Sequence, residues 1–336
     1  MAGMTRRQFG LGALAVPALA NTATAQVTAI RFGTQYGLPF LPQMVMEAQR
    51  LVEKHAKGLS GLQVDWLTAS GPGALNDALL SGNMEFVNVA PPSLATLWEK
   101  SANTARPVRA LCTVQSMPYV LVTRNPSVKT IADFTEKDRI AVPTVKISGQ
   151  AMMLQIAAAK RWGFEQYERL DPLTVSLAHP DAAAAMLSNK LEITAHFCVA
   201  PFQYYELAAP GMRVVLKSYD VLGGPHTNGV QVTTLQFYQD NPRICEAVFA
   251  AHEEANAFIK KHPADAARIY LDLSKDRRSS ADEITGMITD PDINYTTTPA
   301  NVMALVEFML KTHRLKTAPS SWKDMFLPLA HALKGT

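Results

Sequence analysis

The chain has 336 residues, of which 48% are hydrophobic and 18% are charged, and its formal net charge is +3. This composition supplies enough apolar material for one or two globular domains. The net charge is small and the sequence has no basic stripe interleaved with aromatic residues, which argues against a nucleic-acid-binding protein. Three cysteines, an odd number at wide spacings, do not indicate a disulfide framework.

An export signal is predicted for residues 1–25. Arg6 and Arg7 precede a mildly apolar stretch, and Ala23-Thr24-Ala25 is typical of a cleavage site. The paired arginines favour the twin-arginine route, and the general secretion route stays open. The apolar stretch is too short for a permanent membrane anchor, and no cysteine stands near the cleavage site to carry a lipid. We therefore expect a mature protein that is released into the periplasm.

Residues 26–117 are predicted to form the first part of one lobe. Three units follow one another, each made of a short apolar strand, a loop of small residues and a helix that begins near a proline or a serine. A fourth strand, residues 108–114, leads to a crossing into a second lobe near Pro118. The first three strands are expected at residues 30–34, 63–67 and 85–89, with helices that end near residues 57, 80 and 100.

Residues 118–224 are predicted to form a second lobe with three units of the same kind. One unit carries the loop from Lys146 to Gln150, ahead of a helix whose first turn has free backbone N–H groups. Such a turn has a partial positive charge and suits an anion or a strong acceptor. The three strands are expected at residues 139–143, 173–177 and 193–198, with further strands at residues 119–122 and 213–216.

Residues 225–336 are predicted to return to the first lobe. Glycine and proline cluster at residues 223–229, and the two crossings between the lobes can serve as a hinge. The remainder is expected to be mostly helical and to pack on the first lobe as a C-terminal helical segment. Apolar stripes predict helices at residues 242–262, 264–271, 302–309 and 322–333.

The two sets of strand–loop–helix units predict an α/β protein with two lobes, each built on a parallel sheet. Ligands of such sheets bind beyond the carboxyl ends of the strands, so the six loops of two facing lobes would meet in one cleft. These loops offer hydroxyl, amide and aromatic side chains, and few acidic ones. The candidate ligand-binding residues are Gln35, Tyr36, Leu38, Ser70, Gly71, Pro91, Ser116, Ser148, Gly149, Gln150, Phe197, Cys198, Phe202, Thr227 and Asn228.

Motifs for nucleotides, metals and catalysis are incomplete. Gly71 and Gly73 begin a dinucleotide fingerprint that lacks its third glycine, and His252 has no second histidine at the spacing of a zinc helix. Cys198 with His196 could suggest a thiol nucleophile and a base, but no third group is visible to orient them. We therefore expect a protein without enzyme activity, catalytic residues, metal or cofactor.

Several segments occur in an order that is typical of one group of binding proteins. They are Lys129–Phe134 before Arg139–Pro143, Leu187–Ile193 before Phe197, and Asn241-Pro242 before a long alanine-rich helix. From about residue 27 to its end, the chain resembles the nitrate/sulfonate/taurine class of ABC-transporter substrate-binding proteins. The resemblance implies a two-lobed type II periplasmic binding fold that closes on a small ligand. It also implies ligand contacts from the loop after the first strand, the loop before Gln150 and the loop after Cys198.

The resemblance and the loop residues together favour a small organic anion as the ligand, such as a sulfonate or a carboxylate with an apolar or aromatic body. A planar heterocycle of the thiamine-precursor pyrimidine type is the alternative. Lesser alternatives are a ligand-sensing signalling protein and an enzyme similar to the pyrimidine synthases of thiamine biosynthesis. The expected partners are the ligand and an ABC permease with its ATPase. We expect a monomer that contacts the inner membrane only through the permease.

Overall fold

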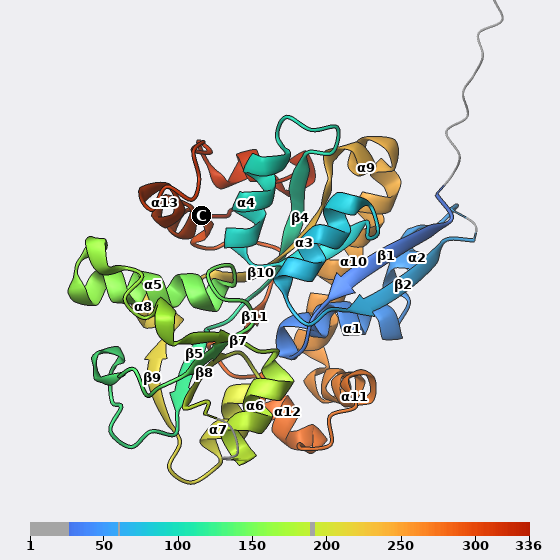
Figure 1. The fold of residues 1–336 in the computed structure, drawn as a ribbon. Helices are drawn as coiled ribbons and strands as arrows, with labels where there is room; N and C mark the ends of the chain where they lie inside the picture. Colours follow the sequence, from blue (N-terminus) through green and yellow to red (C-terminus); the bar gives the residue numbers. More distant parts are fainter. Residues whose placement is uncertain (1–26, 60, 189–191) are drawn as a thin grey trace, which may run out of the picture.

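The computed structural model describes residues 27–59, 61–188 and 192–336. These residues form two sheets surrounded by helices, and the chain passes from one sheet to the other and back (Figure 1). The predicted export signal, residues 1–25, lies outside the described residues.

The first sheet collects strands from both ends of the described chain. Its strands are β1 Ala29–Thr34, β2 Gln63–Thr68, β3 Phe86–Val89, β4 Val108–Ser116, β10 Thr227–Thr234 and β11 Asn294–Tyr295. Their order across the sheet is β11-β4-β10-β3-β1-β2. β1 is parallel to β2 and β3, whereas β10 is antiparallel to β3 and β4.

The second sheet is built from the middle of the chain. Its strands are β5 Val120–Thr123, β6 Ile140–Val142, β7 Thr174–Ser176, β8 Ala195–Cys198 and β9 Arg213–Lys217. Their order is β7-β6-β8-β5-β9. β6 is parallel to β7 and β8, whereas β5 is antiparallel to β8 and β9.

The predicted α/β fold with two lobes is confirmed, but the prediction that both sheets are parallel is only partly correct. In each sheet three neighbouring strands pair in parallel, and the strands beside the crossings pair with antiparallel neighbours. β4 leaves the first sheet at Ser116, and β10 enters it beside the same residue at Thr227. The two strands therefore run in opposite directions. A parallel neighbour would need a crossover connection back to the same end of the sheet, which a direct passage between lobes does not supply.

Helices surround the two sheets (Figure 1). In chain order they are α1 Leu41–Ala48, α2 Leu51–His55, α3 Pro72–Ser81, α4 Pro91–Ser101, α5 Gly149–Trp162, α6 His179–Ser188, α7 Phe202–Leu207, α8 Ser218–Leu222, α9 Leu235–Asp240, α10 Pro242–Lys261, α11 Pro263–Ser274, α12 Ala281–Ile288 and α13 Val302–Lys311.

Two predicted helices differ from the structure. The helix expected to end near residue 57 is divided into α1 and α2, because Arg50 has a left-handed backbone with φ of 51°. The helix expected at residues 322–333 is replaced by two short 3-10 turns. Leu327 between them is extended, since Pro328 disfavours helical backbone in the residue before it, and its N–H donates to the carbonyl of Ala110 in β4.

The C-terminal helices pack on the first lobe, and one of them also reaches the second. Ile244 and Val248 of α10 are buried in one apolar cluster with Leu41 of α1, as the apolar stripe of α10 predicts. α13 packs on α4, and the ring of Phe308 lies edge-on to Tyr167 with ring centroids 5.8 Å apart. The expectation that this segment packs on the first lobe is thus extended by a contact beside α5.

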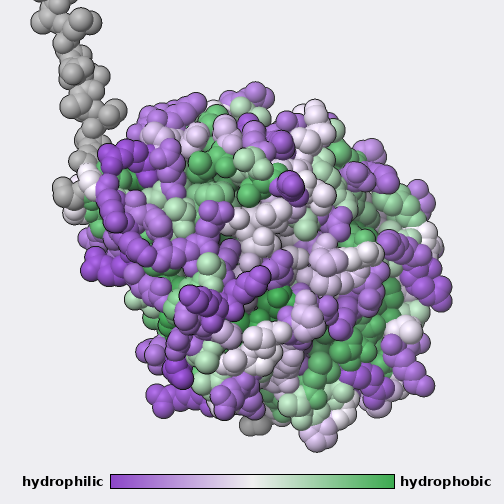
Figure 2. All heavy atoms as spheres, turned by 180° about the vertical axis from the view of Figure 1, so that it is seen from behind, coloured by the Kyte–Doolittle hydropathy of each residue, from purple (hydrophilic) through white to green (hydrophobic). Residues whose placement is uncertain are grey.

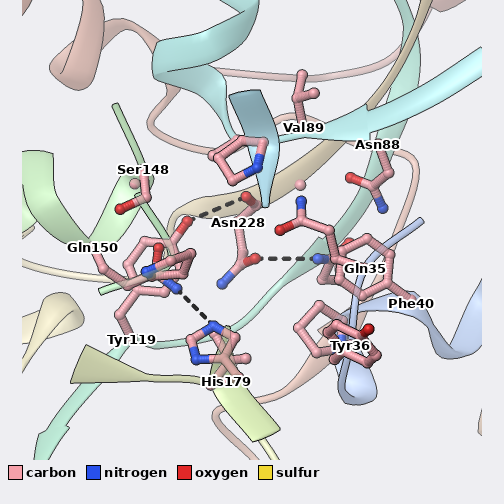
Figure 3. Close-up of a pocket in the computed structure, with 18 residues that line it drawn as sticks. Gln35, Tyr36, Phe40, Asn88, Val89, Tyr119, Ser148, Gln150, His179 and Asn228 are labelled. Atoms are coloured by element: carbon pink, nitrogen blue, oxygen red, sulfur yellow. Dashed lines mark hydrogen bonds between the residues drawn. The ribbon is translucent and has the colours of Figure 1, made fainter. Parts of the chain in front are cut away.

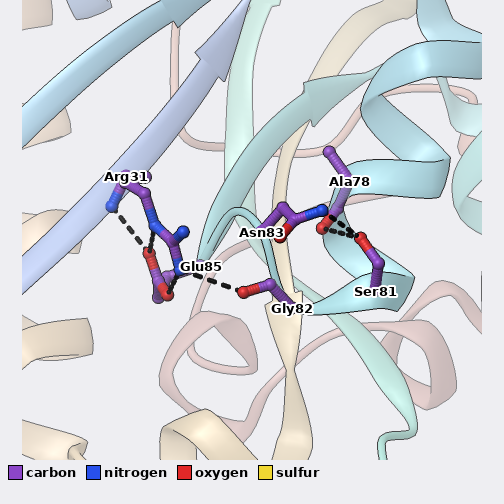
Figure 4. A network of polar contacts seen from close by, with 6 residues as sticks. All are labelled: Arg31, Ala78, Ser81, Gly82, Asn83 and Glu85. Carbon is purple, nitrogen blue, oxygen red and sulfur yellow. Dashed lines mark hydrogen bonds and ion pairs between the residues drawn. The ribbon is translucent and has the colours of Figure 1, made fainter.

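An ion pair holds the start of β1 against the loop that leads into β3 (Figure 4). Arg31 Nη2 lies 2.7 Å from Glu85 Oε1 and donates to the carbonyl of Gly82 at 2.9 Å. The backbone N–H of Arg31 also donates to Glu85 Oε2 at 2.7 Å. In the same loop, Asn83 Nδ2 donates to Ser81 Oγ at 3.0 Å. These bonds fix the end of the sheet that lies opposite the candidate site.

Polar and apolar residues mix on the surface. Figure 2 shows charged and polar residues spread over the face seen from behind, with smaller apolar areas between them. Among the described residues, no helix is long and apolar enough to cross a membrane. The three cysteines are buried and have free thiols.

Candidate functional site

A small cavity lies between the two sheets, at the carboxyl ends of their parallel strands (Figure 3). Its volume is about 50 Å³. Each of the six parallel strands contributes a lining residue at or soon after its carboxyl end, which is where ligands of α/β sheets bind. The lining residues are Gln35, Tyr36, Pro39, Phe40, Pro72, Asn88, Val89, Ala90, Gln115, Tyr119, Pro143, Ser148, Gly149, Gln150, His179, Val199, Asn228 and Gly229.

The loop after β1 joins the two lobes at the edge of the cavity. Leu38 N donates to the carbonyl of Ala200, which follows β8, at 2.8 Å. Gly37 has a φ of 101°, and a Cβ at this position would lie 2.8 Å from the same carbonyl oxygen. Only glycine adopts this backbone without strain and without a clash. The loop therefore places Gln35 and Tyr36 against the second lobe.

Amide side chains from the first sheet form one wall. Gln115 Nε2 donates to Asn228 Oδ1 at 3.2 Å, and Asn88 Nδ2 donates to Gln43 Oε1 at 3.2 Å. Gly229 lies between them, and a Cβ there would come within 2.7 Å of Asn88 Oδ1 and of Gln115 Nε2. Gln115 Oε1 is buried and, among the described residues, has no hydrogen-bond partner. A buried acceptor without a partner is costly, so this wall favours a ligand that donates a hydrogen bond.

The first turn of α5 forms the opposite wall. Ser148 is the N-cap, and its Oγ accepts from Ala151 N at 3.3 Å. The backbone N–H groups of Gly149 and Gln150 have no carbonyl to reach within the helix, as in every first turn. A Cβ on Gly149 would lie 2.3 Å from the hydroxyl of Tyr119, so glycine is required for this close approach. The turn thus brings two donors and a partial positive charge to the cavity.

Tyr119 and His179 complete the wall from the second lobe. The hydroxyl of Tyr119 donates to the carbonyl of Asn228 at 3.3 Å, and burial raises the pKa of this phenol. His179 begins α6 and lies with its Nε2 3.2 Å from Gln150 Nε2. Burial, with a smaller effect from His196, lowers the pKa of His179 well below 6.5. Both rings are therefore neutral at pH 7, and the cavity lining is polar without a permanent charge.

A second, larger cavity of about 450 Å³ adjoins the first and shares Gln35 and Tyr36 with it. Phe202, Tyr205 and Tyr270 give it an aromatic wall. Its rim carries charged residues of the segment after α11, namely Lys275, Asp276, Arg277 and Arg278.

The structure brings together six of the fifteen residues that were predicted to bind a ligand. Gln35, Tyr36, Ser148, Gly149, Gln150 and Asn228 all line the small cavity. Phe202 lines only the larger one. The others lie outside both linings, and they are Leu38, Ser70, Gly71, Pro91, Ser116, Phe197, Cys198 and Thr227.

The predicted residues that lie outside both cavities do so because of their immediate surroundings in the structure. Phe197 and Cys198 are fully buried within β8, and the thiol of Cys198 donates to the carbonyl of Val120 at 3.1 Å. Val199, the next residue, reaches the cavity in their place. Ser116 Oγ donates to the carbonyl of His226 at 2.8 Å, so its hydroxyl is used within the hinge. Side chains alternate between faces of a strand, and a loop prediction alone does not say which one faces the ligand.

Besides Phe40, four polar or aromatic lining residues were not predicted. Asn88 and Gln115 are polar residues inside otherwise apolar strands, which was a signal available in the sequence. Tyr119 stands at the first crossing, and His179 precedes a proline at a helix start. The roles of Tyr119 and His179 depend on contacts with residues distant in the sequence, and no local sequence pattern predicts such contacts.

Comparisons with known proteins agree with this architecture. No protein-family model matches the sequence, and neither does the sequence of any curated protein. Solved structures do match. The periplasmic aliphatic sulphonate binding protein SsuA from Escherichia coli has a TM-score of 0.63 and 17% identity, covering 89% of this chain and 92% of that one. The periplasmic nitrate-binding protein NrtA from Synechocystis PCC 6803 has a TM-score of 0.68 and 14% identity, covering 89% and 85%.

The alkanesulfonate-binding protein SsuA from Xanthomonas axonopodis pv. citri, bound to MOPS, has a TM-score of 0.65 and 15% identity. This match covers 92% of the present chain and 98% of the other. At such low identity, the feature that these matches show in common is the fold. The chain has the two-lobed α/β fold of the periplasmic binding proteins.

Proposed function

We propose that the protein is an exported solute-binding protein that captures a small organic anion, a sulfonate or a carboxylate, between its two lobes. It delivers this ligand to the permease and ATPase of an ABC importer and acts as a monomer in the periplasm. In this proposal, residues 26–117 and 225–336 form one lobe, residues 118–224 form the other, and the crossings between them are the hinge. The observation that carries the proposal is the cavity at the carboxyl ends of all six parallel strands.

The donors around the cavity support an anionic ligand. Gly149 and Gln150 present first-turn N–H groups at the start of a helix of 14 residues, where the helix dipole favours negative charge. Amide groups of Asn88 and Asn228 line the opposite wall, and each amide nitrogen already donates one hydrogen within the protein, to Gln43 and to Met117. None of the described lining residues is an aspartate or a glutamate, so no carboxylate opposes an anion.

The sizes of the two cavities support an anion with an apolar body. The inner cavity of about 50 Å³ holds only a small group, such as a sulfonate or a carboxylate head. The adjoining cavity of about 450 Å³ has aromatic walls from Phe202, Tyr205 and Tyr270. A planar or aliphatic body would stack there, since aromatic side chains bury large apolar surfaces.

A neutral planar heterocycle is the second candidate, and two features favour it. The described lining of the inner cavity contains neither lysine nor arginine. Gln115 Oε1 is a buried acceptor without a partner in the part of the chain that the structure describes, and a ring N–H would satisfy it where a sulfonate would not. A neutral heterocycle that donates a hydrogen bond to Gln115 is therefore the alternative to the anion.

Calorimetry with the mature protein tests the proposal. Methanesulfonate, benzenesulfonate and benzoate represent the anions, and uracil represents the heterocycles. We expect heat from at least one anion and a matching thermal shift. Heat only with uracil would overturn the anionic ligand, and no binding by any small molecule, added or co-purified, would overturn the solute-binding function.

Uptake measurements test the transport role. Deletion of the gene should abolish uptake of the identified ligand by whole cells, and restoring the gene should recover it. Unchanged uptake with a lost response to the ligand would support the signalling alternative in place of transport.

A further inference from the structure

Four hydrogen-bonded side chains lead from the cavity into the second lobe. Gln150 Nε2 lies 3.2 Å from His179 Nε2, and His179 Nδ1 lies 2.8 Å from His196 Nε2. His196 Nδ1 lies 2.5 Å from Glu206 Oε1. We name Gln150, His179, His196 and Glu206 the histidine relay. It connects α5, α6, β8 and α7.

The far end of the histidine relay is an ionisable pair that a ligand does not touch. His196 and Glu206 are both 0% exposed, and only Gln150 and His179 line the cavity. A buried carboxylate needs hydrogen bonds or a positive partner. His196 Nδ1 supplies this contact.

Without an added proton, the carboxylate of Glu206 determines which nitrogen of each histidine carries a hydrogen. Glu206 can only accept, so His196 donates from Nδ1 and accepts at Nε2. His179 must then donate from Nδ1 and accept at Nε2. Gln150 consequently donates its amide N–H to His179, which is the arrangement of its Nε2 in the structure. In this state the carbonyl oxygen of Gln150 is not used within the relay, and one of its two amide hydrogens is bound to His179.

One added proton reverses the direction of the two hydrogen bonds nearest the cavity, whereas His196 Nδ1 still donates to Glu206. When the proton resides on the His196 and Glu206 pair with both imidazole nitrogens of His196 protonated, His196 donates from Nε2 to His179 Nδ1. His179 then carries its hydrogen on Nε2 and needs an acceptor. A half-turn of the Gln150 amide supplies its oxygen to His179 and leaves its NH₂ group for the ligand. His179 stays neutral in both states, in keeping with its burial.

We propose that the histidine relay couples anion binding to the uptake of one proton, with His196 and Glu206 as positioning residues that decide whether Gln150 offers the ligand an acceptor or a donor. This inference rests on the proposed solute-binding function. Two effects act in the same direction. The added proton turns a donor toward the anion, and it neutralises the buried negative charge of Glu206 behind the cavity.

The other titratable groups that face the relay do not replace this proton. Cys198 Sγ lies 3.8 Å from Glu206 Oε2, and burial followed by the charge of Glu206 raises the pKa of the thiol. Tyr119 packs edge-on to Phe197 of β8 and is kept neutral by burial. From the side of α7, Phe202 stacks on His179, and the hydroxyl of Tyr205 is bonded to Asp276.

A metal site is a poorer explanation of the same side chains. Ligand atoms of His196, Cys198 and Glu206 lie within 4.8 Å of one another. The distance of 2.5 Å between His196 Nδ1 and Glu206 Oε1 is hydrogen-bonding contact, slightly shorter than the roughly 2.7–2.9 Å of a charge-assisted N–H···O bond. Two ligand atoms on a tetrahedral zinc ion would stand about 3.3 Å apart. The thiol is also a hydrogen-bond donor to Val120, so it is not a free thiolate.

Proton uptake is measured directly on the unaltered mature protein. Benzenesulfonate and benzoate are fully ionised between about pH 6 and pH 8, so the ligands add no titration of their own. Calorimetric titrations in cacodylate and in Tris, which differ in ionisation enthalpy, give the number of protons taken up. Buffers that are themselves sulfonates are avoided. We expect the protein to take up nearly one proton per bound anion. The association constant should then fall by up to about tenfold for each unit by which the pH rises.

Substitution of the far end of the relay provides the second measurement. Glu206→Gln removes the ionisable carboxylate and should make the affinity nearly independent of pH while binding persists. Asp171→Asn is the matched control. Its carboxylate accepts from Gln155 in the same lobe, outside the relay, and this variant should keep the pH dependence of the unaltered protein.

The outcomes separate the two levels of the proposal. Anion binding without proton uptake, or with the same pH dependence in Glu206→Gln as in Asp171→Asn, overturns the relay and leaves the solute-binding function intact. Failure of every anion to bind overturns the anionic ligand and the relay together. If Glu206→Gln does not fold, the two-buffer measurement on the unaltered protein decides the question alone.

Discussion

Replacement of Gly149 by alanine tests whether the close approach of α5 to Tyr119 builds the site. The new Cβ would lie 2.3 Å from the hydroxyl oxygen of Tyr119 and 2.9 Å from Cζ of the same ring. Comfortable contact needs about 3.5 Å, so roughly 1 Å must open between the helix and the ring. Tyr119 is buried, with only 2% of its surface exposed, and its hydroxyl donates to the carbonyl of Asn228. The ring therefore has little room to move.

The expected loss of stability follows from three contributions. Overpacking of a filled site costs about 1–3 kcal/mol. A weakened hydrogen bond from Tyr119 adds about 1 kcal/mol, and the better helix propensity of alanine offsets up to about 1 kcal/mol. We therefore expect Gly149→Ala to lower the free energy of unfolding by about 2 kcal/mol. It should also weaken anion binding, because Gly149 and Tyr119 both line the cavity.

Urea unfolding at constant m-value measures the loss, and calorimetry measures the affinity. Gly286→Ala is the matched control, since it lies within α12 and its Cβ would meet no atom within 4 Å. This control should gain about 0.5–1 kcal/mol from helix propensity. Adding Tyr119→Phe to Gly149→Ala should recover part of the loss by removing the nearest atom. Equal stability of Gly149→Ala and the unaltered protein would refute the reasoning.

Three further predictions concern the lobe contact, the sheet end and pH. Gly37→Ala should weaken ligand affinity severalfold in calorimetry, because its Cβ would lie 2.8 Å from the carbonyl oxygen of Ala200 across the cleft; unchanged affinity would contradict this role. Arg31→Ala should cost about 1 kcal/mol in urea unfolding, since the pair with Glu85 is partly exposed, and a cost that does not shrink in high salt would argue against an ionic origin. Burial lowers the pKa of His226 from 6.5 to about 4, so the unfolded chain takes up this proton first as pH falls. Stability should then be fully present above pH 6.5 and should fall toward pH 4 by up to about 1.4 kcal/mol per unit from this group, and His226→Asn should remove that share of the slope in urea unfolding across this range.

Local sequence patterns predicted most of the framework. Apolar runs followed by proline or small residues gave the parallel strands and the starts of their helices, because periodicity and helix caps depend on neighbouring residues. The capping box of Ser280 and Glu283 at the start of α12 was a local signal of the same kind that the prediction left out. The antiparallel strands at the crossings could not be derived in this way. Their direction depends on how the chain returns between lobes, which is set by contacts over more than 100 residues, as between Ser116 and Thr227.

The candidate site also has a part that the sequence predicted and a part that only the tertiary structure determined. The sequence by itself determined that loops at the carboxyl ends of the strands carry Gln35, Ser148 and Gln150, since loop order follows from strand order. Only the tertiary structure decided that Val199 faces the cavity in place of Cys198, because the end of a strand fixes which side chain points inward. The histidine relay is likewise a tertiary feature. Its members come from four elements, and their hydrogen bonds depend on a packing geometry that no local pattern of the sequence encodes.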